Sequence, residues 1–158
     1  MGATGVKLGT RFVTTHECDA SIEFKYSYLD CNKNDLEIIK SPVGLPGRVI
    51  KNDFVKQIVI GNKKVFKCPW QCLKSCKIKE APFCIAQALL NSAKGKMSNG
   101  FAFAGSKAYL ATKLESVKEV FIDLIKNYNK AANIDKTFNL HFFNVAKKIA
   151  FQPVYNNN

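Results

Sequence analysis

The chain opens with the stretch on which the fold prediction depends, Gly2-Ala3-Thr4-Gly5-Val6-Lys7-Leu8-Gly9-Thr10-Arg11-Phe12. We interpret Val6 to Leu8 as a short buried strand flanked by glycines. A glycine just past a strand lets the backbone turn sharply and approach a ligand, and exposed amides beside a hydroxyl suit a phosphate group. Gly9 and Thr10 therefore indicate a phosphate site, although the same residues also fit an ordinary strand-to-helix turn.

Length and composition predict a single folded domain. The chain has 158 residues, enough for a sizeable core, and its hydrophobic fraction of 47% argues against disorder. No apolar run is long enough to span a membrane, and the N-terminus lacks the apolar stretch of a signal peptide. We expect a soluble, cytoplasmic protein without a membrane partner.

The net charge of +12 is high, but its distribution does not favour nucleic-acid binding. Arg11 and Arg48 are the only arginines among 24 basic residues, and the lysines are spread along the chain. A nucleic-acid interface would instead cluster arginines with aromatic residues. We therefore expect no nucleic-acid partner and only a general attraction to anionic ligands.

Apolar residues at helical spacing predict five helices, over residues 19–31, 49–60, 83–93, 117–128 and 138–151. A strand is predicted at Leu36–Lys40. Residues 41–48 contain two prolines and two glycines, so they are predicted as a shaped loop without regular structure. Gly61 and Gly95 are predicted to end two of the helices, and Pro82 to open one.

Two segments are predicted to pack. The helix over 117–128 has Ser116 and Glu119 as a capping box and carries one apolar stripe that we interpret as core. Its members are Val117, Val120, Phe121, Leu124, Ile125 and Tyr128. Residues 100–106 alternate small and aromatic side chains, which indicates packing against another element. Strand and helix alternate only once along the chain, which is too little for a complete parallel sheet.

Several motifs together resemble the C-terminal part of the nitronate monooxygenases, formerly called 2-nitropropane dioxygenases. In order they are GVKLGTRF (5–12), ECDA (17–20), KSPVGLPGRVIKN (40–52), CLKSC (72–76), CIA (84–86) and GFAFAGSKAY (100–109). The flavin-dependent enoyl-ACP reductases are related to this family and share its barrel. The resemblance runs from about residue 2 to residue 130.

The resemblance implies an α/β fold, namely a TIM (β/α)8 barrel that binds FMN. This chain would correspond to the part of the barrel from the eighth strand onward, together with a helical subdomain. Taken alone, the chain should be mostly α with a few short strands. The implied organisation is a last βα unit at 1–35, a helical and loop region of the same domain at 36–132, and an extension at 133–158. The family's histidine near the flavin falls before this part, so neither His16 nor His141 receives a catalytic role.

The resemblance also implies which residues contact the cofactor. The family holds the FMN phosphate with residues that close the eighth strand, which correspond here to Lys7, Leu8, Gly9 and Thr10. Residues 100–108 correspond to a segment that folds towards the flavin, where Ser106 or Lys107 could approach the substrate. Plain packing of that segment is the alternative.

Four cysteines form a separate candidate site. Cys68, Cys72, Cys76 and Cys84 lie within seventeen residues, and on a helix the spacing of four would place the first three on one face. Four thiols could hold zinc or an iron–sulfur cluster. The alternative is that they are reduced, partly buried cysteines.

By resemblance, the function expected is FMN-dependent oxidation of alkyl nitronates by O2, with FMN and a nitronate as ligands. One alternative is an enoyl-ACP reductase acting on an enoyl thioester. Another is a chain without activity, or one that binds metal through its cysteines. Because one barrel strand cannot form the FMN cavity, we expect this chain alone not to hold FMN tightly.

Overall fold

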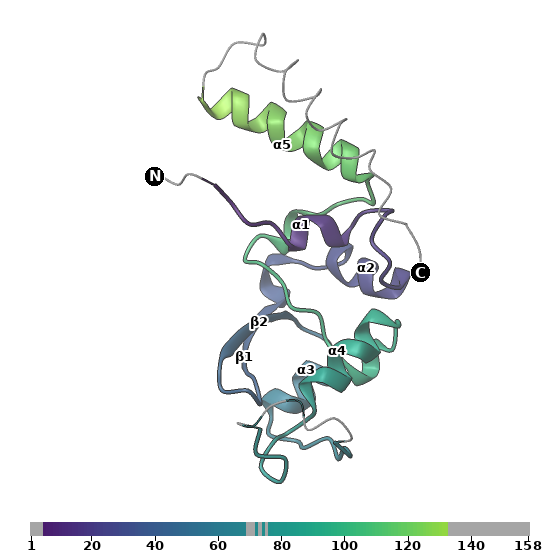
Figure 1. The fold of residues 1–158 in the computed structure, drawn as a ribbon, viewed down its shortest axis with the longest axis vertical. Coiled ribbons are helices and arrows are strands. Elements are labelled where there is room, and N and C mark those ends of the chain that lie inside the picture. The colour runs from purple at the N-terminus through teal and green to yellow at the C-terminus, as the bar shows by residue number, and fades with distance from the viewer. Residues whose placement is uncertain (1–4, 69–71, 73, 75, 133–158) are drawn as a thin grey trace, which may run out of the picture. The chain divides into compact units, whose positions relative to one another are not determined.

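The computed structural model describes residues 5–68, 72, 74 and 76–132, and the chain divides into two compact units, Met1–Val117 and Lys118–Asn158 (Figure 1). The helices and strands in chain order are α1 (Thr10–Val13), α2 (Ile22–Leu29), β1 (Leu36–Lys40), β2 (Pro46–Ile50), α3 (Asp53–Val59), α4 (Ile85–Ala93) and α5 (Val117–Ala132). Three single 3-10 turns join them, η1 (Lys33–Asp35), η2 (Met97–Asn99) and η3 (Ala108–Leu110).

The expectation of a mostly helical chain with a few short strands is confirmed. Of the described helices, none combines the length and the apolar character needed to cross a membrane. The predicted helix over 138–151 lies outside the described residues.

The predicted strand at Val6 to Leu8 is wrong. These residues have no regular secondary structure, and the Val6 side chain is 83% exposed. A strand needs a neighbour to accept and donate its backbone hydrogen bonds, and none of the described residues pairs with this segment. The chain first becomes regular at α1, directly after Gly9.

A β-hairpin forms the centre of the first unit. β1 and β2 pair antiparallel, from Leu36 opposite Ile50 to Lys40 opposite Pro46. The predicted loop over 41–48 is correct for its first half, where Gly44 has φ 89°, and wrong for Pro46–Arg48, which belong to β2. Pro46 is tolerated because it is the first residue of its strand.

The segment after η2 runs along the free edge of β2. The Ile50 amide donates to the Ala102 carbonyl at 2.9 Å, and the Ala104 amide donates to the Arg48 carbonyl at 3.0 Å. Phe103 also forms an isolated antiparallel bridge with Val49. The expectation that residues 100–106 pack against another element is therefore confirmed, and that element is β2.

Alternate residues of this segment enter two different core clusters. Phe101 is fully buried in a cluster with Ile39, Val49, Phe54, Val55, Phe83 and Ala88. Its ring lies 5.7 Å from that of Phe83 and 6.0 Å from that of Phe54, centroid to centroid. Ala102 and Ala104 belong instead to a second cluster around Tyr28. Opposite faces of one extended segment thus join both halves of the unit.

The helix predictions that fall within the described residues are right in kind but not in their bounds. α3 starts at Asp53 and not at residue 49, because Val49 and Ile50 complete β2 and Asn52 caps the helix by accepting from the Val55 amide at 2.9 Å. Gly61 and Gly95 end α3 and α4 with φ of 89° and 82°, as predicted. In these conformations only glycine avoids strain.

The start of α4 and the apolar stripe of α5 also differ in part from the predictions. α4 starts at Ile85, three residues after Pro82, with Cys84 at its N-cap. The core interpretation of α5 holds for Val120, which is fully buried, whereas Phe121 is 45% and Tyr128 66% exposed. An amphipathic stripe indicates burial only where another element covers it.

Candidate functional site

Gly9 and Thr10 line a broad cavity of about 540 Å³ in the first unit, as a phosphate role would require. The other residues around it come from α1, α2, β2 and the segment beside β2, and they are Val13, Tyr28, Arg48, Phe103 and Ala104. Lys7 and Leu8 are exposed and do not line it. The structure therefore brings together two of the four residues implied by the resemblance.

The Thr10 side chain connects the two segments that the sequence singled out. Its hydroxyl accepts a hydrogen bond from the Gly105 amide at 2.9 Å. A hydroxyl can accept and donate at once, so this bond leaves its proton available to an acceptor in the cavity. Ser106 and Lys107, the other candidates from that segment, are exposed and do not line the cavity.

Arg48 is the residue of this cavity that the sequence prediction missed. It lies on β2 opposite Ile38, so the hairpin register fixes its position. Among the described residues its guanidinium forms no ion pair. A guanidinium presents several donors in one plane and suits phosphate or carboxylate groups. The available signal was that Arg48 is one of only two arginines and follows a Pro-Gly pair.

Tyr28 forms the buried wall of the cavity. Its hydroxyl donates to the Phe103 carbonyl at 2.6 Å, which ties α2 to the segment beside β2. Burial raises the pKa of Tyr28 well above its ordinary value, so the hydroxyl remains protonated at physiological pH. No acidic side chain is among the described residues around the cavity, which makes it suitable for an anion.

An ion pair fixes the turn that carries Gly9 and Thr10. Arg11 Nη2 lies 2.6 Å from Glu115 Oε2, and Lys113 Nζ lies 3.2 Å from Glu115 Oε1. The Arg11 hydrogen bond holds the pKa of Glu115 below its ordinary value, with Lys113 adding to the effect and burial opposing it. Backbone bonds from Glu115 to Thr14 and from His16 to Glu115 complete this connection.

His16, the histidine within the described residues, does not line the cavity. His16 is exposed and is placed by its backbone amide, which donates to the Glu115 carbonyl at 2.9 Å. His141 lies outside the described residues.

The four clustered cysteines line one cavity of about 260 Å³. Cys68, Cys72 and Cys76 lie outside every helix, so no helical face collects them, and Cys84 precedes α4. Within the described residues, no group of three or more His, Cys, Asp or Glu side chains is arranged to hold a metal ion. Cys18 and Cys31 do not line this cavity.

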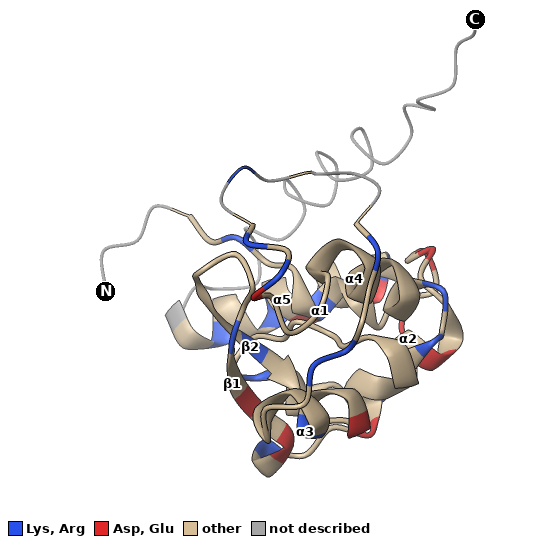
Figure 2. Ribbon diagram, turned by 90° about the horizontal axis from the view of Figure 1, so that it is seen from below, with Lys and Arg blue, Asp and Glu red and all other residues tan. Residues whose placement is uncertain are grey.

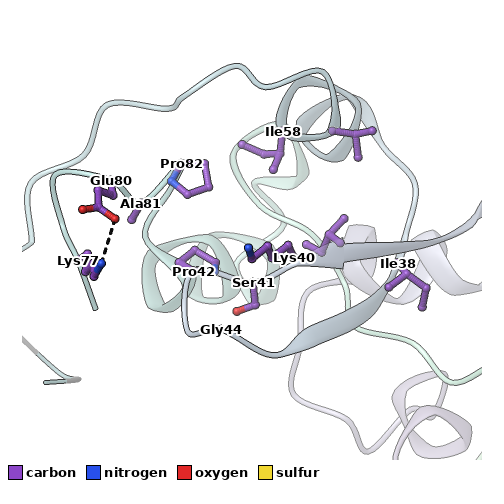
Figure 3. Close-up of a pocket in the computed structure, with 12 residues that line it drawn as sticks. Ile38, Lys40, Ser41, Pro42, Gly44, Ile58, Lys77, Glu80, Ala81 and Pro82 are labelled. Carbon is purple, nitrogen blue, oxygen red and sulfur yellow. Dashed lines mark ion pairs between the residues drawn. The ribbon is translucent and has the colours of Figure 1, made fainter. Parts of the chain in front are cut away.

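A third cavity, of about 560 Å³, lies between the hairpin, α3 and residues 77–82 (Figure 3). Its apolar wall includes Ile38, Ile58 and Pro82, and an ion pair of 3.5 Å joins Lys77 to Glu80 at its rim. None of the residues predicted to bind a cofactor or metal lines it.

The basic residues do not gather on one element. Figure 2 shows lysine and arginine on β1, on α3 and on several loops, with acidic residues among them. This is the distribution of a solvated surface more than that of a nucleic-acid interface.

Comparison with known families identifies the family of this chain. Residues 1–127 match the family described as nitronate monooxygenase, and the chain belongs to this family. The resemblance drawn from the sequence motifs is thereby confirmed. A comparison with proteins of curated function gives no match.

Solved structures support the same fold. FabK from Thermotoga maritima superimposes with a TM-score of 0.65 at 22% identity, over 84% of this chain and 39% of that chain. A point mutant of the same FabK gives a TM-score of 0.62 at 21% identity, over 84% and 35%. This chain therefore spans less than two fifths of the length of these structures.

Proposed function

We propose that this chain is the C-terminal part of an FMN-dependent oxidoreductase of the nitronate monooxygenase type, which oxidises alkyl nitronates with O2. Membership of the family supports the flavin class. The observation that carries the cofactor assignment is the cavity that joins Gly9, Thr10 and Arg48 without an acidic neighbour among the described residues.

Each donor around this cavity would have its own role towards the FMN phosphate. Thr10 would donate its hydroxyl proton while the Gly105 amide holds the oxygen in place. Arg48 would add a charged hydrogen bond, and the space beside Gly9 is open, since a Cβ there would meet nothing within 4 Å. When bound, the flavin would supply the redox chemistry, and these residues would position it.

The phosphate role can be tested by titrating the chain with FMN and, separately, with riboflavin, which lacks the phosphate. We expect weak binding of FMN and weaker binding of riboflavin. Arg48→Ala should weaken FMN binding about 10- to 150-fold, since a hydrogen bond to a charged group contributes about 1.5–3 kcal/mol and every 1.4 kcal/mol is about tenfold. Lys7→Ala removes the same charge from an exposed position outside the cavity and should change little. Equal affinities for FMN and riboflavin would contradict the assignment.

The prediction that the chain alone holds FMN only loosely is tested by its colour on purification. Stoichiometric flavin absorbance in the purified chain would show that it forms a complete cofactor site. Its absence, together with weak phosphate-dependent binding, is the expected result.

A second enzymatic function is favoured by the solved structures, because FabK is an enoyl-ACP reductase. In the full-length enzyme of which this chain would be a part, nitrite release from a nitronate and NADH oxidation with an enoyl thioester distinguish the two activities. Absence of both from that protein, with FMN bound, would favour the non-enzymatic alternative.

A further inference from the structure

The cavity of about 560 Å³ beside the hairpin contributes nothing to the proposed flavin site. Among the described residues, it shares no lining residue with the cavity near Thr10 and Arg48. Its volume falls within the range of about 300–1,000 Å³ that is typical of ligand sites. A ligand of this cavity would therefore bind independently of FMN.

The cavity lies along the free edge of β1. Side chains alternate between the two faces of a strand, yet the consecutive residues 38–41 all line the cavity. The cavity is therefore beside the strand and not over one of its faces. Because β2 occupies one edge of β1, the cavity lies at the other edge, which faces the end of α3 and residues 77–82 (Figure 3).

The hydrogen bonds of β2 show which residues of β1 bond to it. The Ile50 amide and the Arg48 carbonyl face away from β1, because each bonds to the segment beyond β2, at 2.9 and 3.0 Å. Hydrogen bonds alternate between the two sides of an antiparallel strand, so the intervening residues of β2 bond to β1. Their partners in the hairpin register are Glu37 and Ile39.

The backbone N–H and C=O groups of Ile38 and Lys40 therefore face the cavity. Residues that alternate with the bonded ones direct these groups to the opposite edge of the strand. None of the described residues pairs with this edge of β1. An unpaired strand edge is a template on which another extended chain can form backbone hydrogen bonds.

Apolar side chains border the β1 edge on both sides. Ile38 is 56% exposed and Val59, at the end of α3, is 53% exposed. Ile58 and Pro82 add to the apolar wall. Apolar side chains of an extended peptide would cover these exposed groups and remove their surface from water.

The charged residues of the cavity favour an acidic ligand. Figure 3 shows the Lys40 side chain directed from β1 towards the cavity. Among the described residues, Lys40 forms no ion pair. The acidic residue of the lining, Glu80, is already paired with Lys77 at 3.5 Å. The cavity therefore has an ammonium group to offer to a carboxylate, in a chain whose net charge is +12.

We propose that the free edge of β1 binds an extended peptide that carries acidic side chains among apolar ones. The peptide would form backbone hydrogen bonds with Ile38 and Lys40 as an added strand. Its apolar side chains would pack against Ile38 and Val59, and one of its carboxylates would pair with the Lys40 ammonium.

The test is fluorescence polarisation of a labelled, capped peptide of alternating valine and glutamate, titrated with the full chain. We expect saturable binding. The same peptide with N-methyl groups on alternate amides should bind at least about tenfold more weakly, because it cannot complete the backbone hydrogen bonds. Equal binding of the methylated peptide, or no binding of the unmodified one, would overturn the proposal.

Two charge-reversal variants separate the site from the general charge of the chain. Lys40→Glu should weaken binding of the valine–glutamate peptide at least about tenfold, because it replaces a charge-assisted hydrogen bond with repulsion. It should also strengthen binding of a valine–lysine peptide. Lys126→Glu makes the same charge change at an exposed position of α5 outside the cavity and should change little. Equal effects of the two variants would refute the assignment.

Hydrogen exchange of the wild-type chain tests the site without any variant. Peptide binding should slow exchange at the Ile38 and Lys40 amides and leave the Phe12 amide of α1 unchanged. Protection confined to other amides would overturn the proposal. Sedimentation velocity of the free chain should show a monomer. A dimer that Lys40→Glu dissociates would assign the β1 edge to a second copy of the chain and would also overturn the proposal.

Discussion

Val6 and Val49 show how differently two regions of this chain use the same side chain. Val6 is 83% exposed in a segment with no secondary structure, whereas Val49 is fully buried in β2. Both come from short apolar runs near glycine, so local sequence does not separate them. The difference is that β2 has β1 on one edge and residues 101–104 on the other. Burial here depends on partners that are distant in sequence.

The largest expected effect comes from the centre of the packed region. Phe101→Ala removes a fully buried ring from the aromatic cluster, and it should lower the free energy of unfolding by about 3–5 kcal/mol. Val6→Ala should change it by less than about 0.5 kcal/mol, because Val6 buries almost nothing. Urea unfolding followed by circular dichroism measures both values. Similar losses of unfolding free energy in the two variants would show that the two regions do not differ in packing.

An intermediate effect is expected where polar groups connect the hairpin to the segment beside it. Asn52 caps α3, and its amide nitrogen also donates to the Gly100 carbonyl at 2.8 Å and the Met97 carbonyl at 3.0 Å. Asn52→Ala should lower the free energy of unfolding by about 1–2 kcal/mol, since it removes a helix cap and leaves partly buried carbonyls unpaired. Asn62→Ala, at an exposed position, is the control. An equal loss of unfolding free energy in the two variants would mean that the hydrogen bonds from Asn52 to Met97 and Gly100 do not contribute to stability.

The close packing around Gly100 leaves no room for a larger side chain at this position. A Cβ there would overlap the Ala88 carbonyl oxygen and the Ser92 hydroxyl. Ser92 itself donates to the Ala88 carbonyl at 2.8 Å and lies 2.9 Å from the Phe101 carbonyl, so α4 and residues 100–101 are in close contact.

The smallest effect on the free energy of unfolding is expected near α1, where an ion pair joins Arg11 to Glu115. The pKa of Glu115 is lowered in the folded chain, so its contribution is complete above its unfolded pKa of about 4.3. It is lost as the pH falls through the lower folded pKa, because the protonated carboxyl no longer attracts Arg11. Glu115→Gln should cost about 1 kcal/mol or less at pH 7, as expected for a partly exposed pair.

Hydrogen exchange locates this pH effect. As the pH falls below the ordinary glutamate pKa of about 4.3 and through the lower pKa of Glu115, the amides of Phe12 and His16 should lose protection before that of Ile50. The Phe12 amide bonds to Gly9 and the His16 amide to Glu115, whereas the Ile50 amide lies between β2 and residue 102. In Glu115→Gln the difference should already be present at pH 7. Simultaneous loss at all three amides would show that the two regions unfold together.

The candidate sites could be predicted only in part from sequence. Gly9 and Thr10 follow from the resemblance and do line a cavity, whereas Lys7 and Leu8 do not. Arg48 was missed because its contribution depends on the hairpin register, which places it beside α1 and α2. The cysteines were grouped because they lie close together in sequence, and all four do line one cavity.

The amino-acid sequence by itself determined the features that depend on neighbouring residues. These are the strand at Leu36–Lys40, the glycine ends of α3 and α4 at Gly61 and Gly95, and the family motifs. Backbone propensity and steric freedom act over a few residues, so the local sequence is enough to predict the features that depend on them. Tertiary structure decided that Val6 stays exposed, that Pro46–Ile50 becomes a strand and that the four clustered cysteines line one cavity. Each of these outcomes depends on hydrogen-bonding or packing partners supplied from elsewhere in the chain.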